Sequence, residues 1–134
     1  MANLTMYTDG GSRGNPGPAG VGAVIYNNGQ KVEELFEYIG RATNNVAEYK
    51  AVILGLKLLA DNYSQAKIEI KADSQLLVKQ LTGEYKVKSD NLKPLYQQIK
   101  ELITNFSKVE FTHIPREENK EADALANQAM DKCR

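Results

Sequence analysis

The sequence predicts an α/β protein built on a mixed β-sheet with helices packed on it. Two observations predict this class: a strand-like run and a hairpin open the chain, and strand and helix patterns then alternate to its end. The length of 134 residues, with 42% hydrophobic and 25% charged residues, fits a single domain over residues 1–134 with one hydrophobic core.

The first elements expected are a strand and a hairpin. Residues 4–8 (LTMYT) form a strand-like run, and residues 9–20 (DGGSRGNPGPAG) are dense in Gly and Pro and indicate a loop. Residues 21–40 fit a hairpin, because the turn signal Asn27–Asn28–Gly29 separates two apolar runs.

The middle of the chain predicts helix, strand and helix. Apolar residues recur at helical spacing from Asn44 to about Ala60, and Thr43 or Asn44 can cap this helix. Residues 67–73 (KIEIKAD) alternate between apolar and charged, as a half-exposed strand does, and residues 74–81 fit a short helix.

The last third predicts one more helix–strand–helix sequence. Residues 83–91 form a polar loop, and Pro94 suits the first turn of a helix. A strand is expected at 108–114, Pro115 ends it, and residues 117–132 fit a terminal helix.

Charge and composition limit the classes of function. The 17 basic and 17 acidic residues cancel, which argues against a protein that grips nucleic acid by bulk charge. No apolar run approaches the roughly 20 residues that span a bilayer. The N-terminal residues lack the pattern of a signal peptide, so we expect a cytoplasmic protein, and a monomer. The single Cys133 is expected to be an incidental tail thiol.

Four acidic residues stand at positions that favour a shared site. Asp9 and Asp73 each end a predicted strand, and sites in mixed sheets gather beyond strand ends. Glu48 and Asp123 lie in predicted helices beside small or apolar residues, which indicates a packed face. Carboxylates brought together repel one another unless a divalent metal neutralises them, and Mg²⁺ prefers such ligands. On spacing alone, surface acids and helix caps remain equally open readings.

Four segments around these acids resemble the signature segments of ribonuclease H, type 1. They are YTDGGSRGNPGPAGVGAV, TNNVAEYKAVILGL, IKADSQLLVKQL and THIPREENKEADALAN, in that order and over essentially the whole chain. The resemblance implies a ribonuclease H-like fold, a mixed five-stranded sheet with helices on both faces. It also implies internal cleavage of the RNA strand of RNA–DNA hybrids by two-metal-ion catalysis, with 5′-phosphate and 3′-hydroxyl ends.

The resemblance also assigns roles to individual residues. Asp9 would be shared by two Mg²⁺ ions, with Mn²⁺ as the alternative ion, while Glu48 and Asp73 complete one shell and Asp123 serves the other. His113, the only histidine, precedes Asp123 by ten residues, as the active-site histidine of bacterial members does. A histidine there can assist proton transfer or product release, although a packed or surface histidine is the simpler alternative.

Further matching positions predict contacts with the hybrid. The RNA strand would be read through its 2′-hydroxyl groups by uncharged side chains and by glycine-loop backbone groups: Gly10, Gly11, Ser12, Asn15, Asn44, Asn45 and Gln75. Arg41 and Thr43 resemble a pocket for a DNA phosphate, although Thr43 can also be only a helix cap. The Trp-rich basic protrusion of some bacterial relatives is short or absent, because the chain has no Trp. Only a local excess of lysines within 79–100 remains to follow the DNA backbone.

Three other functions stay open. The chain can be a binding protein of this fold with weak or no cleavage, a domain linked to a reverse transcriptase, or an α/β phosphatase or signalling domain. A phosphatase or signalling domain would not require the glycine loop with Asn15 or residues 43–45, so these segments argue against that alternative.

Overall fold

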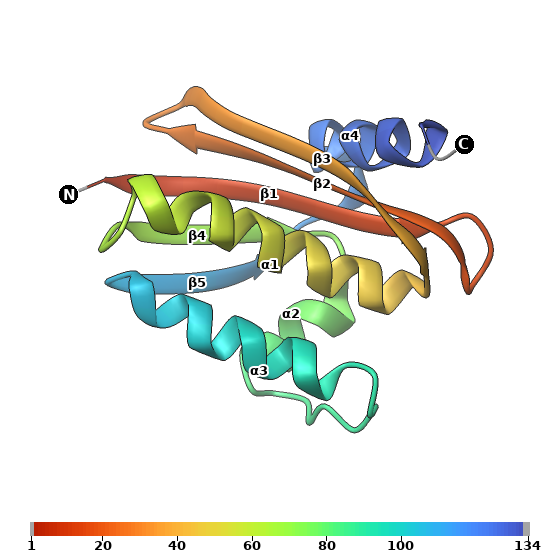
Figure 1. Cartoon of the computed structure of the whole chain (residues 1–134). Coiled ribbons are helices and arrows are strands. Elements are labelled where there is room, and N and C mark those ends of the chain that lie inside the picture. Colours follow the sequence, from red (N-terminus) through yellow and green to blue (C-terminus); the bar gives the residue numbers. More distant parts are fainter. Residues whose placement is uncertain (1, 133–134) are drawn as a thin grey trace.

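The computed structural model describes residues 2–132, so Cys133 and the expectation attached to it lie outside the described residues. Five strands form one sheet in the order β3-β2-β1-β4-β5 (Figure 1). The strands are β1 (Asn3–Ser12), β2 (Gly17–Asn27), β3 (Gln30–Ala42), β4 (Lys67–Ala72) and β5 (Lys108–His113). The β1–β2 and β2–β3 pairs are antiparallel, whereas the β1–β4 and β4–β5 pairs are parallel. The mixed five-stranded sheet is therefore confirmed.

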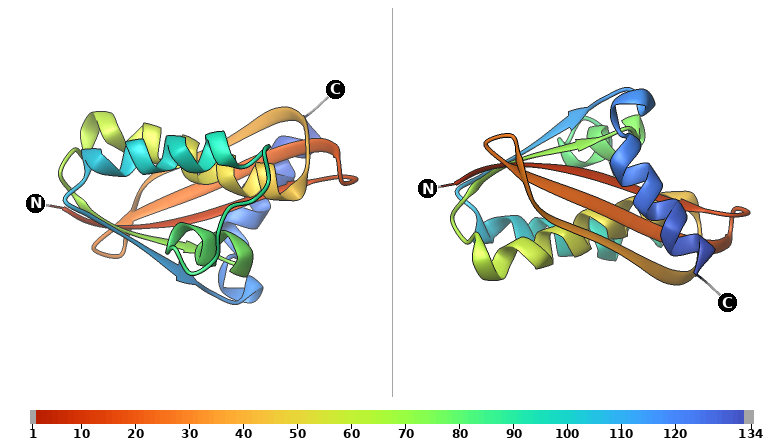
Figure 2. Two further views of the ribbon diagram at one scale, coloured as in Figure 1. Left: turned by 90° about the horizontal axis from the view of Figure 1, so that it is seen from below. Right: turned by 90° about the horizontal axis from the view of Figure 1, so that it is seen from above.

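Helices cover both faces of this sheet, as expected. They are α1 (Asn44–Asn62), α2 (Gln75–Leu81), α3 (Lys93–Leu102) and α4 (Lys120–Asp131). Figure 2 shows α1 and α3 on one face and α4 on the other, where it crosses β1, β2 and β3. Within residues 2–132, no helix is both long and apolar enough to cross a membrane.

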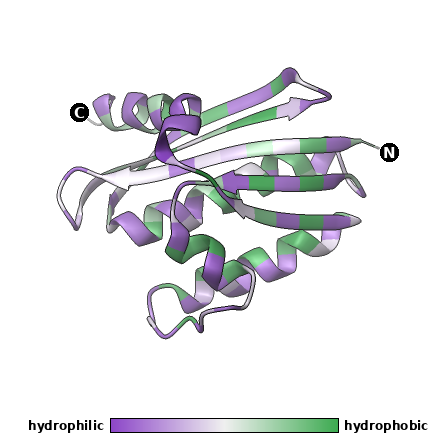
Figure 3. Cartoon of the chain, turned by 180° about the vertical axis from the view of Figure 1, so that it is seen from behind, coloured by the Kyte–Doolittle hydropathy of each residue, from purple (hydrophilic) through white to green (hydrophobic). Residues whose placement is uncertain are grey.

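The main core lies between the sheet and α1. Leu4 and Met6 of β1 and Leu56 and Leu59 of α1 are almost fully buried there. In β4 the apolar residues at alternate positions are buried and the charged ones are not, and Figure 3 shows this alternation along the strand. Burial on one face fixes the strand register, because a shift by one residue would turn every apolar side chain to the other side.

The expectation of a loop over residues 9–20 is largely wrong. β1 continues to Ser12 and β2 already begins at Gly17, so only residues 13–16 form the loop. The glycines are present because helices pack very close to these strands: a Cβ on Gly22 would overlap the backbone of α4, and one on Gly10 would overlap the backbone of α1. In the sequence alone, a glycine that lets a helix pack close to a strand cannot be told apart from a glycine in a loop.

Two further boundaries differ from the expectation. Residues Arg116–Glu118 form a 3-10 turn, so α4 begins at Lys120 and not near residue 117. β3 extends to Ala42, directly before the Thr43 cap of α1.

Candidate functional site

Three of the four expected acids converge at one end of the sheet. Asp9 lies in β1 and Asp73 follows β4, and these strands are parallel neighbours, so their carboxyl ends meet at the same edge. Glu48 enters from α1. Carboxylate oxygens of Asp9, Glu48 and Asp73 all lie within 4.8 Å of one another.

Asp123 reaches the same place from the opposite face of the sheet. It lies in the first turn of α4, and its carboxyl group is close enough to that of Asp9 to raise the pKa of Asp9. All four acids line one cleft of about 460 Å³. The acids that the sequence singled out are therefore brought to one site from β1, α1, the end of β4 and α4.

The acids perturb each other strongly. Burial, followed by repulsion from Asp73 and the interaction with the carboxyl group of Asp123, raises the pKa of Asp9 to about 8. Burial, followed by repulsion from Asp9 and Asp73, raises the pKa of Glu48 well above its usual value. The backbone N–H of Gly10 opposes both changes. When they are ionised, the four carboxylates thus lack enough positive charge around them to balance their own.

These features fit a divalent cation. Among residues 2–132, no Lys or Arg lies within ion-pair distance of any of the four acids. The donors are oxygens only, which suits hard cations such as Mg²⁺ and Mn²⁺ better than zinc or copper. Asp9, Glu48 and Asp73 would hold one ion, and Asp9 with Asp123 offers a place for a second.

Gly10 contributes to the site through its backbone. Its N–H donates to Oε1 of Glu48 at 3.0 Å and so fixes the carboxylate of α1 against β1. A side chain on Gly10 would overlap the carbonyl of Ala47. Gly10 therefore lets α1 approach closely enough to deliver Glu48.

A polar network joins the glycine loop to the start of α1. The Ser12 N–H donates to Oδ1 of Asn44 at 2.9 Å, and the Asn44 N–H donates to Oδ1 of Asn15 at 3.0 Å. Thr43, not Asn44, caps the helix, since its hydroxyl accepts from the Val46 N–H. The side chain of Asn44 is consequently engaged with the loop, and Gly11, Ser12 and Asn44 all line the cleft.

Other expected contact residues lie away from the cleft lining. Within the described chain, the lining includes none of Asn15, Arg41, Thr43, Asn45 and Gln75. Arg41, Asn45 and Gln75 are exposed and lie near the end of β3 and at the starts of α1 and α2. Their roles stay predictions.

His113 does not reach the cleft either. It ends β5, pairs with Ala72 of β4 and is exposed, and the cleft lining drawn from residues 2–132 does not contain it. Arg116, three residues further along, does line the cleft, and its positive charge lowers the pKa of Glu48. Sequence reasoning missed Arg116, because the 3-10 turn that aims it at the acids has no clear signature in the sequence.

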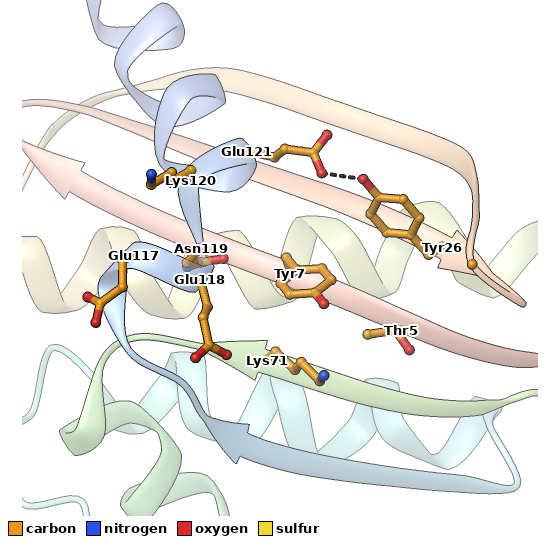
Figure 4. A pocket seen from close by; sticks show the side chains of 10 residues that line it. Thr5, Tyr7, Tyr26, Lys71, Glu117, Glu118, Asn119, Lys120 and Glu121 are labelled. Atoms are coloured by element: carbon orange, nitrogen blue, oxygen red, sulfur yellow. Dashed lines mark hydrogen bonds between the residues drawn. The ribbon is translucent and has the colours of Figure 1, made fainter.

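A second cavity of about 410 Å³ lies on the sheet beside the start of α4 (Figure 4). Tyr7 and Tyr26 meet edge to face there, with Lys71 above the Tyr7 ring. Tyr26 donates to Glu121, which also pairs with Lys31 at 2.9 Å. We place the functional site in the other cleft, because there the carboxylates converge.

Comparisons with known proteins agree with this site. The family model described as "Reverse transcriptase-like" matches residues 7–129. The chain is 48% identical to the Ribonuclease HI of Halobacterium salinarum over 126 residues, which is 93% of this chain and 63% of that protein. It thus spans less than two thirds of the length of this relative, and 35% of the length of a bifunctional protein of Mycobacterium tuberculosis.

Two solved structures match over nearly their full length. The RNase H1 of Halobacterium salinarum superposes with a TM-score of 0.93 at 46% identity, covering 98% of this chain and 99% of that one. LC11-RNase H1, solved in complex with an RNA/DNA hybrid, gives a TM-score of 0.92 at 44% identity, covering 96% and 97% of the two chains. With its fold, its four converging acids and these matches, the chain belongs to the type 1 ribonuclease H family.

Proposed function

We propose that this protein hydrolyses the RNA strand of RNA–DNA hybrids internally, leaving 5′-phosphate and 3′-hydroxyl ends. The observation that carries the proposal is the convergence of Asp9, Glu48 and Asp73 within 4.8 Å, with Asp123 in the same cleft. The hybrid bound to the similar LC11-RNase H1 supports the choice of substrate.

The four acids would hold two Mg²⁺ ions, or Mn²⁺ in their place. When bound there, such ions supply an activated water and stabilise the negative charge on the departing oxygen. The acids balance the ions' charge and fix their positions, while Arg116 places a cation at the cleft wall, where a phosphate oxygen can pair with it.

Discrimination of RNA from DNA would fall to the polar network at the start of α1, of which Ser12 and Asn44 line the cleft. A 2′-hydroxyl group both donates and accepts hydrogen bonds, so uncharged amides and hydroxyls suit it. Ser12, Asn15 and Asn44 hold one another in place through hydrogen bonds. Such a preorganised set presents its free groups to the RNA strand at low entropic cost.

A cleavage assay tests the proposal. We would incubate the protein with Mg²⁺ and an end-labelled hybrid, duplex DNA, duplex RNA, or a DNA duplex containing one ribonucleotide, and map the ends of the products. We expect internal cuts in the hybrid alone, and none by Asp9→Asn or Asp73→Asn. Binding of the hybrid without any metal-dependent cut would instead support the alternative of a binding protein. The cytoplasmic location and the monomeric state stay predictions.

A further inference from the structure

Asn119 connects the carboxylate-bearing segments of the site. It lies at the start of α4 and is only 1% exposed (Figure 4). Its side-chain amide donates to the Thr8 carbonyl at 2.9 Å and to Oδ2 of Asp73 at 3.0 Å. Its backbone carbonyl accepts from the Asp123 N–H at 3.1 Å.

These bonds reach three of the four acids. Thr8 directly precedes Asp9 in β1, so its carbonyl fixes the backbone from which Asp9 projects. Asp73 is held through its own carboxylate, and Asp123 through the first turn of its helix. The side chain of Asn119, which stands at the start of α4, thus ties this helix to β1 and to the end of β4, whereas the bond to Asp123 belongs to the helix backbone.

The orientation of the amide is determined by its partners. Both Thr8 O and Asp73 Oδ2 are acceptors, so the NH₂ group must face them. The Asn119 Oδ1 is then buried and, among the residues that the structure describes, accepts no hydrogen bond. A buried carbonyl of this kind destabilises a fold, so stability alone does not account for an asparagine here.

We propose that Asn119 is a positioning residue that holds Asp73, and with it Asp9 and Asp123, in the arrangement that binds the metal ions. The proposal rests on the metal-dependent function proposed above. A neutral donor suits this task because it restrains Oδ2 of Asp73 without cancelling charge. A Lys or Arg would neutralise the carboxylate and compete with the metal, and an Asp would add further repulsion.

Binding of Mg²⁺ alone tests the proposal without any cleavage. We would measure Mg²⁺ affinity by titration calorimetry for the wild type, Asn119→Ala and Asn119→Ser, the last of which keeps one donor. We expect the dissociation constant to rise about tenfold or more in Asn119→Ala and less in Asn119→Ser. In the hybrid assay, the Mg²⁺ concentration for half-maximal rate should rise in parallel, with much of the maximal rate recovered at saturation.

Tyr49→Phe is the matched control for stability. Tyr49 is 1% exposed and donates to the buried Gln80 at 2.6 Å, so its loss also breaks a buried hydrogen bond, in the core and outside the lining of the cleft. It should lower the melting temperature and leave Mg²⁺ affinity unchanged. Should Asn119→Ala fail to fold, Asn119→Ser carries the comparison.

Unchanged Mg²⁺ affinity in both Asn119 variants would overturn the proposal, as would no Mg²⁺ binding by the wild type. Normal Mg²⁺ binding by the wild type without hybrid cleavage would overturn only the proposed function. The two failures are therefore distinguishable.

Discussion

Asp9 directly follows the part of β1 that pairs with β4, Asp73 directly follows β4, and repulsion between their carboxylates is the largest charge–charge contribution to the raised pKa of Asp9. In the metal-free protein this pair opposes folding whenever both groups are ionised. The geometry that suits metal binding is thus a source of instability without the metal.

Asp9→Asn should stabilise the metal-free protein while abolishing cleavage. The amide keeps the shape of the side chain and removes the buried charge. We expect a gain of several kcal/mol in the free energy of unfolding at pH 8, because the pKa of Asp9 rises from 3.8 to about 8 in the folded state and each tenfold change in proton affinity corresponds to about 1.4 kcal/mol. Urea denaturation in EDTA measures the gain. Asp131→Asn, at an exposed position, is the control and should show little change.

The metal-free protein should lose stability as the pH rises from about 4 to about 8. The pKa of Asp9 is about 8 in the folded state against a usual value of 3.8, so the folded state binds more protons between these values. Its stability is then greatest at the acidic end of this range and falls toward the alkaline end, as far as Asp9 is concerned. Melting temperatures in EDTA across this range measure the effect. Saturating Mg²⁺ should flatten the slope, and a slope unaltered by Asp9→Asn would contradict the assignment.

The sequence predicted the sheet well, and it singled out four acids that the structure brings to one cleft, although their role as metal ligands stays a prediction. Alternation in residues 67–73 fixes β4, and acids that follow strands share a sheet edge once the strands are parallel. The order of strands and helices, together with the four segments that resemble ribonuclease H, supplied the rest of the predicted fold and site.

Features that depend on close packing were not predictable in this way. The Gly-rich stretch is mostly strand, because Gly20 and Gly22 admit α4 to the surface of β2. The contributions of Arg116 and Asn119 follow from a 3-10 turn whose direction is fixed only when β5 and α4 are in place. The composition of a short segment does not reveal such contacts between residues that are far apart in the chain.

Arg116→Ala should slow hybrid cleavage more than His113→Ala does. Arg116 lines the cleft, whereas His113 is exposed at the end of β5. Loss of a cation facing a phosphate should lower the rate about tenfold or more at saturating Mg²⁺, with little change in melting temperature. Arg116→Lys should restore part of the rate. The prediction for His113→Ala remains a lower turnover with unchanged metal binding, and equal or larger losses than in Arg116→Ala would assign the main role to His113.

Gly10→Ala should disrupt the site and the fold together. A Cβ there would overlap the Ala47 carbonyl, and because that atom belongs to the α1 backbone, the whole first turn of the helix must move. We expect a loss of about 3 kcal/mol in the free energy of unfolding, at the upper end of overpacking effects. Glu48 would move with the helix and lose its bond from the Gly10 N–H, so Mg²⁺ affinity should fall as well.

Gly11→Ala is the neighbouring control for this effect. A Cβ on Gly11 would meet only side-chain atoms at 3.8 and 3.9 Å, which is ordinary contact. Denaturation and Mg²⁺ titration of the two variants side by side should show a large loss for Gly10→Ala and a small one for Gly11→Ala. Similar losses would mean that general strand flexibility, and not the approach of α1 to β1, is what these glycines provide.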